Sequence, residues 1–86
     1  MLSDSLQQAL DSVAFQVDRD EAAWGPYNSA HEAKGILDEE VWEFTKEVYV
    51  KQELRDLNKM RKELLQIAAV AIRAAAHVCN EERGRR

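Results

Sequence analysis

Hydrophobic residues recur at steps of three and four along most of this chain, which is the period of an amphipathic α-helix. In the first such stretch the recurring residues are Leu6, Leu10, Val13 and Val17. Ser3 or Asp4 stands in the right place to cap the first turn. The pattern predicts a helix from about residue 3 to residue 22.

The segment WGPYN, residues 24–28, interrupts this pattern. Gly25 and Pro26 are poorly tolerated inside a helix, because proline lacks an N–H donor and restricts the residue before it. Ser29 and Glu32 have the spacing of a capping box, which marks the start of a second helix. Its apolar stripe consists of Ala33, Leu37, Val41, Phe44 and Val48. We expect this helix at residues 30–50.

A third helix is predicted from about residue 57 to residue 82, after the polar connection KQELRD. Asp56 or Asn58 is available as its cap. Apolar residues cover well over half of its circumference and leave one narrow polar strip. The strip is formed by Lys59, Lys62, Gln66, Arg73 and His77. Two helices of the same short chain are too few to cover so broad an apolar surface.

Small residues on the third helix would let a neighbouring backbone approach closely. They are Ala68, Ala69, Ala71, Ala74, Ala75 and Ala76. On the second helix, Gly35, Trp42 and Tyr49 recur every seven residues opposite the main stripe. We therefore expect an all-α fold with one domain, residues 1–86, whose three helices complete a four-helix-type bundle by homo-oligomerisation, as a dimer or a tetramer.

Composition narrows the setting. The chain has 86 residues, a formal charge of -4 and one cysteine. The acidic balance argues against nucleic-acid binding, because phosphate neutralisation supplies most of that affinity, and the terminal RGRR is expected to be a solvated tail. The start MLSDSLQQAL lacks a basic leader and the longest apolar run, IAAVAI, is too short to cross a membrane. These features favour a soluble protein in the reducing cytoplasm.

Carboxylates crowd the second helix in the stretch HEAKGILDEEVWEF, residues 31–44. Glu40 falls at the margin of the apolar stripe, and Glu63 lies inside the apolar arc of the third helix. A buried carboxylate must be paired, neutralised or bound to a cation. Mg²⁺ is suited to this task, since it takes oxygen ligands from carboxylates on adjacent helical turns, with water and substrate phosphates.

A second interpretation is a solvated acidic face with salt bridges along the helix. It would pair Glu39 or Glu43 with Lys46, and Glu47 with Lys51. We favour this interpretation for Asp38, Glu32 and Glu47. The interior positions of Glu40 and Glu63 favour a cation there instead.

The order Glu39-Glu40-x-x-Glu43, followed by Glu63-x-x-Gln66, resembles the Glu-Glu-x-x-Glu and Glu-x-x-Asp pattern of the MazG-like all-α nucleoside triphosphate pyrophosphohydrolases. The segments WGPYNSAHEAKGILDEEVWEF and KELLQIAAVAIRAA resemble the two metal-binding regions of that family. The similarity covers roughly residues 20–78. It implies a bundle of at least two subunits that uses Mg²⁺ to hydrolyse a nucleoside triphosphate to a monophosphate and pyrophosphate.

Carried over by position, the resemblance makes Glu40, Glu43 and Glu63 metal ligands and Glu39 a supporting ligand or base. Gln66 stands where the pattern has Asp, so it offers an oxygen but removes one negative charge. Weaker metal binding would follow. Glu47 and Glu32 are candidates to supply the missing negative charge. The alternative function is a non-catalytic helical oligomerisation or regulatory module with a degenerate metal site.

The remaining candidates rest on residue type. Trp24, Tyr27 and Trp42 are suited to stack on a nucleobase or to anchor the fold. Four cations match phosphate by charge, although a solvated surface role is favoured: Lys46, Lys51, Lys59 and Arg73. His31 and His77 are expected on the surface, and Cys79 is expected to act as a small apolar residue.

Overall fold

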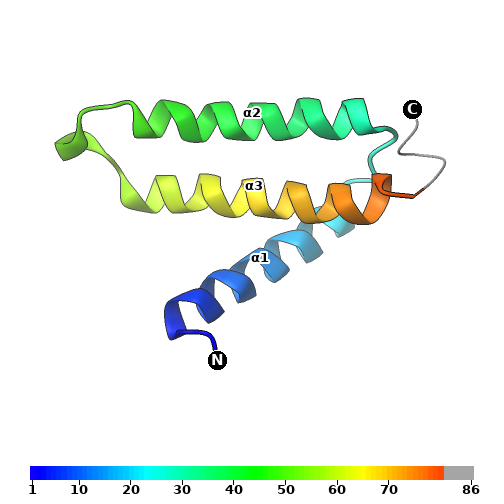
Figure 1. The fold of residues 1–86 in the computed structure, drawn as a ribbon, viewed down its shortest axis with the longest axis horizontal. Coiled ribbons are helices and arrows are strands. Elements are labelled where there is room, and N and C mark those ends of the chain that lie inside the picture. Colours follow the sequence, from blue (N-terminus) through cyan, green and yellow to red (C-terminus); the bar gives the residue numbers. More distant parts are fainter. Residues whose placement is uncertain (81–86) are drawn as a thin grey trace.

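The computed structural model describes residues 1–80 and is all-helical over that range (Figure 1). Its helices are α1 (Asp4–Ala23), α2 (Ala30–Val48) and α3 (Leu57–Val78), and a short 3-10 turn, η1 (Gln52–Leu54), joins α2 to α3. The all-α prediction is therefore confirmed for the described residues. Each predicted helix is present, with its first residue within one position of the expected start.

Side-chain caps explain where the helices begin. The hydroxyl oxygen of Ser3 accepts a hydrogen bond from the Leu6 amide at 3.2 Å, and that of Ser29 accepts one from the Glu32 amide at 3.1 Å. The Asp56 carboxylate accepts from the Lys59 amide at 3.1 Å. Each bond satisfies an N–H group that has no partner within its helix. Ser3 and Asp56 are thus the caps of α1 and α3.

Two helix ends differ from prediction. α2 ends at Val48 rather than at residue 50, because the Arg55 guanidinium reaches back and donates two hydrogen bonds, of 3.0 and 2.8 Å, to the Val48 carbonyl oxygen. α3 ends at Val78, and residues 79 and 80 are already outside the helix. The predicted last residues, 81 and 82, lie outside the described range, as do the RGRR residues.

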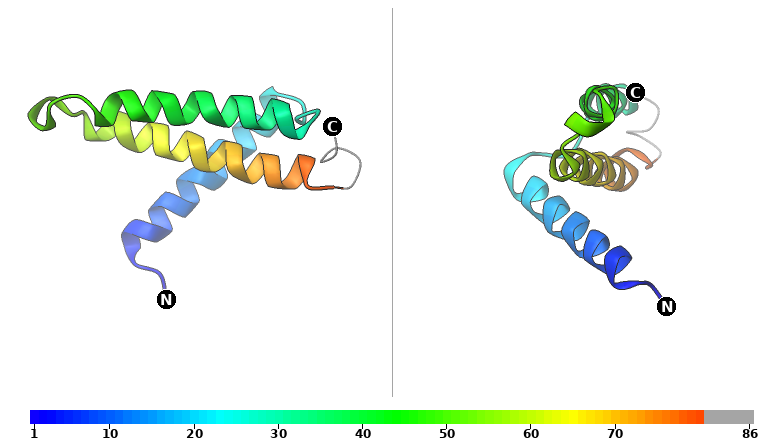
Figure 2. Two further views of the ribbon diagram at one scale, coloured as in Figure 1. Left: turned by 45° about the horizontal axis from the view of Figure 1, so that its top comes forward. Right: turned by 90° about the vertical axis from the view of Figure 1, so that its left-hand side faces the viewer.

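The helices form a hairpin with one oblique arm. α2 and α3 run antiparallel side by side, while α1 packs on α3 and diverges so that its N-terminal end stands clear of the hairpin (Figures 1 and 2). The buried cluster lies where the α1–α2 loop meets the hairpin and contains Tyr27, Ala33, Val70 and Val78. The loop is therefore part of the core.

Much apolar surface stays exposed in the single chain. On α1 only Val13 is buried, whereas Leu6, Leu10 and Phe15 are 55%, 51% and 65% exposed. The face of α2 that carries Trp42 and leads to Tyr49 is likewise exposed. None of the helices in the described part of the chain is long and apolar enough to span a membrane.

Candidate functional site

A cavity of about 540 Å³ opens where the three helices meet, which is within the size range of small-molecule sites. Its walls come from four segments: Asp20 of α1, the loop residues 24–28, one face of α2 and one face of α3. On α2 the lining residues are Glu32, Ile36 and Glu40, and on α3 they are Gln66, Val70 and Arg73. Each set recurs at three- or four-residue steps, so each forms one stripe of its helix.

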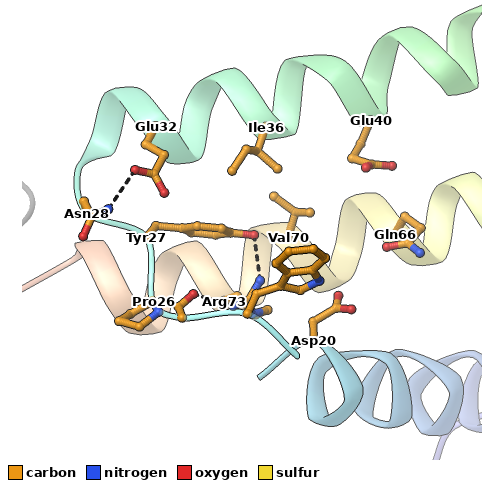
Figure 3. A pocket seen from close by; sticks show the side chains of 12 residues that line it. Asp20, Pro26, Tyr27, Asn28, Glu32, Ile36, Glu40, Gln66, Val70 and Arg73 are labelled. Carbon is orange, nitrogen blue, oxygen red and sulfur yellow. Dashed lines mark hydrogen bonds between the residues drawn. The ribbon is translucent and has the colours of Figure 1, made fainter. Parts of the chain in front are cut away.

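The two ends of the cavity differ in chemistry (Figure 3). Glu40 and Gln66 face each other at one end, and Asp20 approaches from α1. Glu32 and Asn28 lie at the opposite end. Ile36 and Val70 provide an apolar middle between them. The cavity is therefore suited to an elongated ligand that is polar at both ends.

Glu40 experiences a strongly acidic environment. Burial raises the pKa of its carboxyl above the ordinary value, and the charges of Glu63, Glu43, Glu39 and Asp20 raise this pKa further. Within residues 1–80, Glu40 has no hydrogen bond or ion pair that would lower its pKa again. A proton or a cation is the species that such a site attracts.

Only part of the predicted metal set lines the cavity. Glu40 and Gln66 do, while Glu43 and Glu63 lie beside it, near enough to affect the Glu40 pKa, and Glu39 is exposed. Within residues 1–80, no three histidine, cysteine, aspartate or glutamate side chains are grouped so that they could hold a metal ion. Any cation at Glu40 must therefore complete its coordination with water or with groups of a ligand.

The salt-bridge predictions have mixed outcomes. The expected pairing of Glu43 with Lys46 is confirmed at 3.1 Å, and Asp38 forms an exposed ion pair with Lys34 at 2.7 Å. The pairing of Glu47 with Lys51 is wrong. Glu47 instead bonds to Lys59 of α3 at 3.0 Å and is only 18% exposed, because α3 packs against this turn of α2.

Arg73 is buried, so the prediction of a solvated Arg73 is wrong. Its side chain is 4% exposed, and its Nε donates to a Glu21 carboxylate oxygen at 2.8 Å. Its two terminal nitrogens donate to the Tyr27 hydroxyl and the Gly25 carbonyl oxygen, each at 3.1 Å. The part of the α3 polar strip that holds Arg73 and His77 faces the end of α1 and the following loop rather than water. Arg73 thereby fixes the wall of the cavity.

His77 belongs to the same cluster and is not the surface residue that was predicted. Its side chain is 15% exposed, and its Nε2 lies 2.8 Å from the Glu21 oxygen that also binds Arg73. Its Nδ1 is buried and has no hydrogen-bond partner among residues 1–80. The hydrogen bonds from Arg73 and then His77 lower the pKa of Glu21. His31 and Cys79 are exposed, so the surface prediction for His31 is confirmed.

The substrate candidates divide in the same way. Trp24, Tyr27 and Arg73 line the cavity, although Tyr27 is also a core residue at 5% exposure. Trp42 and Lys46 lie outside it, and Trp42 is 60% exposed. Sequence reasoning missed Asp20 and Asn28. The available signal was position: Asp20 lies in the last turn before the WGPYN segment, and Asn28 is the last residue of that segment, just before the next helix.

No family model matches the chain, and no curated protein or solved structure shows significant similarity to it.

Proposed function

We propose that this protein is a Mg²⁺-dependent nucleoside triphosphate pyrophosphohydrolase that converts (d)NTP to (d)NMP and pyrophosphate in the cytoplasm and clears non-canonical or excess nucleotides. The observation that supports it best is Glu40, whose pKa is raised by burial and by Glu63, Glu43, Glu39 and Asp20 at one end of a cavity. Bringing a divalent cation to this end would relieve the repulsion. A triphosphate supplies further oxygen atoms for such a cation.

The donor set suits Mg²⁺. Carboxylate and amide oxygens are its usual protein ligands, and it commonly takes only one or two carboxylates plus waters and substrate phosphates. Glu40 and Gln66 would hold it, with waters and substrate phosphates completing its coordination, and Glu43 and Glu63 would contribute negative charge from beside the cavity. Asp20 restores, from α1, the negative charge that Gln66 lacks. When bound, Mg²⁺ neutralises phosphate oxygens and lowers the pKa of the attacking water.

The other residues have supporting tasks. Glu39 is exposed beside the acidic end and is the proposed proton acceptor. Trp24 offers its ring to the base from the cavity wall. Arg73 and Tyr27 hold the loop in place through their 3.1 Å hydrogen bond rather than bind phosphate. The surface that receives the substrate is thus set by α1, the loop and the hairpin together.

The proposal includes a homo-oligomer, a dimer or a tetramer. Its support is the exposed apolar surface of Leu6, Leu10 and Phe15 on α1 and of Leu64 and Ile72 on α3. A second copy that packs on these faces would bury them and complete a four-helix-type bundle. Sedimentation velocity over a range of protein concentrations checks this assembly.

Pyrophosphate release from a panel of deoxynucleoside triphosphates, with and without Mg²⁺, tests the activity. We expect Mg²⁺-dependent release that falls at least a hundredfold in Glu40→Gln and at least tenfold in Asp20→Asn, because each removes a charge that binds the cation. Asp38→Asn is the matched control, since it removes the same charge from the exposed pair with Lys34. It should keep full activity.

Two outcomes would count against the enzyme. Release from none of the triphosphates, but release in Gln66→Asp, would indicate the alternative function, a non-catalytic module with a degenerate site. Release that is equal in Glu40→Gln and the natural chain would place the chemistry elsewhere.

A further inference from the structure

The end of the cavity away from Glu40 has a defined polar edge. The Asn28 Nδ2 donates a hydrogen bond to Glu32 Oε2 at 3.1 Å, and both residues line the cavity. A carboxylate only accepts, so this bond fixes the orientation of the Asn28 amide, with nitrogen towards Glu32. The edge therefore presents an amide donor beside two carboxylate acceptors.

Spacing along α2 places this edge at a useful distance from the acidic end. Glu32, Ile36 and Glu40 are separated by four residues each, which corresponds to a rise of roughly 12 Å from the first to the last at 1.5 Å per residue. A nucleotide spans a comparable length from the pairing edge of its base to its phosphates. Figure 3 shows Ile36 and Val70 between the two ends, where the flat face of a base can pack.

We propose that Glu32, oriented by Asn28, selects guanine as the base of the nucleotide. The proposal rests on the proposed function for the acidic end, where the triphosphate binds. The pairing edge of guanine carries O6, N1–H and the 2-amino group in that order. O6 accepts from the second N–H of the Asn28 amide, and N1–H and the 2-amino group donate to the two oxygens of Glu32.

The same edge discriminates against other purines. Adenine places its 6-amino donor against the Asn28 donor and its N1 lone pair against the Glu32 carboxylate, so both contacts are repulsive. Hypoxanthine keeps O6 and N1–H but has no 2-amino group, so it loses one charge-assisted hydrogen bond. A lost hydrogen bond to a charged group lowers affinity by roughly ten- to a hundredfold.

Binding of non-hydrolysable α,β-methylene triphosphates tests this selection without requiring catalysis. The probes are the deoxyguanosine, deoxyinosine and deoxyadenosine analogues with Mg²⁺, measured by titration calorimetry. We expect the guanine analogue to bind at least tenfold more tightly than the hypoxanthine analogue and more tightly still than the adenine analogue. Glu32→Gln should reduce the guanine-to-hypoxanthine ratio to near one, because an amide replaces one acceptor oxygen with a donor.

Two controls accompany this measurement. Asp38→Asn removes a carboxylate from the same helix outside the cavity and should keep the ratio. Asn28→Ala removes the O6 donor, so it should reduce the preference for guanine over adenine. Circular dichroism confirms that each variant remains helical. Equal binding of the three analogues, or an unchanged ratio in Glu32→Gln, would overturn the proposal.

Pyrophosphate release from dGTP, dITP and dATP, measured in parallel, separates the two proposals. Hydrolysis without base preference would contradict guanine selection and leave the hydrolase proposal intact. Guanine-selective binding that depends on Glu32, without hydrolysis of any triphosphate, would contradict the hydrolase and support the base site. Absence of binding and of hydrolysis would contradict both.

Discussion

Glu40, which lines the cavity, and Glu21, which is bonded to the cavity-lining Arg73, behave in opposite ways. Glu21 receives hydrogen bonds from Arg73 and His77, and its pKa is lowered. Glu40 is half-buried near other carboxylates, and its pKa is raised. The first is matched by the fold itself and joins α1 to α3. The second has no ion-pair or hydrogen-bond partner among residues 1–80, which is the kind of site where functional groups are often found.

The largest effect on stability is expected when the hydrogen bonds of Arg73 to Glu21 and its neighbours are removed. Arg73→Met removes a guanidinium that donates three hydrogen bonds, to the Glu21 carboxylate, the Tyr27 hydroxyl and the Gly25 carbonyl oxygen. We expect a loss of about 3 kcal/mol in the free energy of unfolding, measured by urea denaturation. Arg61→Met, at an exposed position on the same helix, is the control and should change stability by less than about 0.5 kcal/mol. Equal losses in both variants would contradict a specific role for Arg73.

A smaller effect on stability, of opposite sign, is expected when Glu40 is replaced. Because ionised Glu40 is disfavoured in the folded state, Glu40→Gln should stabilise the Mg²⁺-free protein by about 0.5–1 kcal/mol at neutral pH. Thermal denaturation with a chelator present measures this gain. Asp38→Asn breaks the exposed ion pair with Lys34 and should instead lower the free energy of unfolding by about 0.3 kcal/mol. A loss of stability in Glu40→Gln would show that the carboxylate is matched after all.

The smallest effect is a difference in pH dependence. The Glu21 pKa is lowered on folding, so its contribution to stability is present at neutral pH and is lost as the pH falls below about 5. The Glu40 pKa is raised, so its ionisation costs stability as the pH rises through that pKa. On acidification, Glu21→Gln should lose less stability than the natural chain. Glu40→Gln should lose its advantage over the natural chain.

Urea midpoints at neutral and at mildly acidic pH, taken for the three proteins, measure these slopes. Parallel slopes for all three would mean that neither carboxyl changes its pKa on folding.

The sequence predicts the helices well, because their signals are local. Ser29 caps α2 as its spacing indicates, and the apolar periodicity locates α1 and α3. The end of α2 was missed by two residues, since it depends on Arg55, which reaches back from beyond the η1 turn. Helix starts are fixed within one turn, whereas this end depends on a side chain seven residues away.

The sequence predicted which residues of a single helix belong to the candidate site, but not which residues of different helices come together there. Glu40 was found because its helical position points inwards, and Gln66 because it follows Glu63 at the spacing of the resembled motif. Asp20 comes from α1, and its approach depends on how the three helices cross. The burial of Arg73 was likewise not predictable from its own helix. Its wheel position is polar, and only the docking of the α1–α2 loop turns that position into a buried one.

The oblique course of α1 has a dynamic consequence. With Val13 as its one buried residue among those described, α1 depends on its C-terminal contacts with α3 to stay docked. Its amide hydrogens should therefore exchange with solvent through local opening well below the free energy of global unfolding. Since Asp20 belongs to both α1 and the cavity wall, each opening also dismantles the cavity. A ligand that occupies the cavity should therefore disfavour the opening of α1 and slow the exchange of its amide hydrogens.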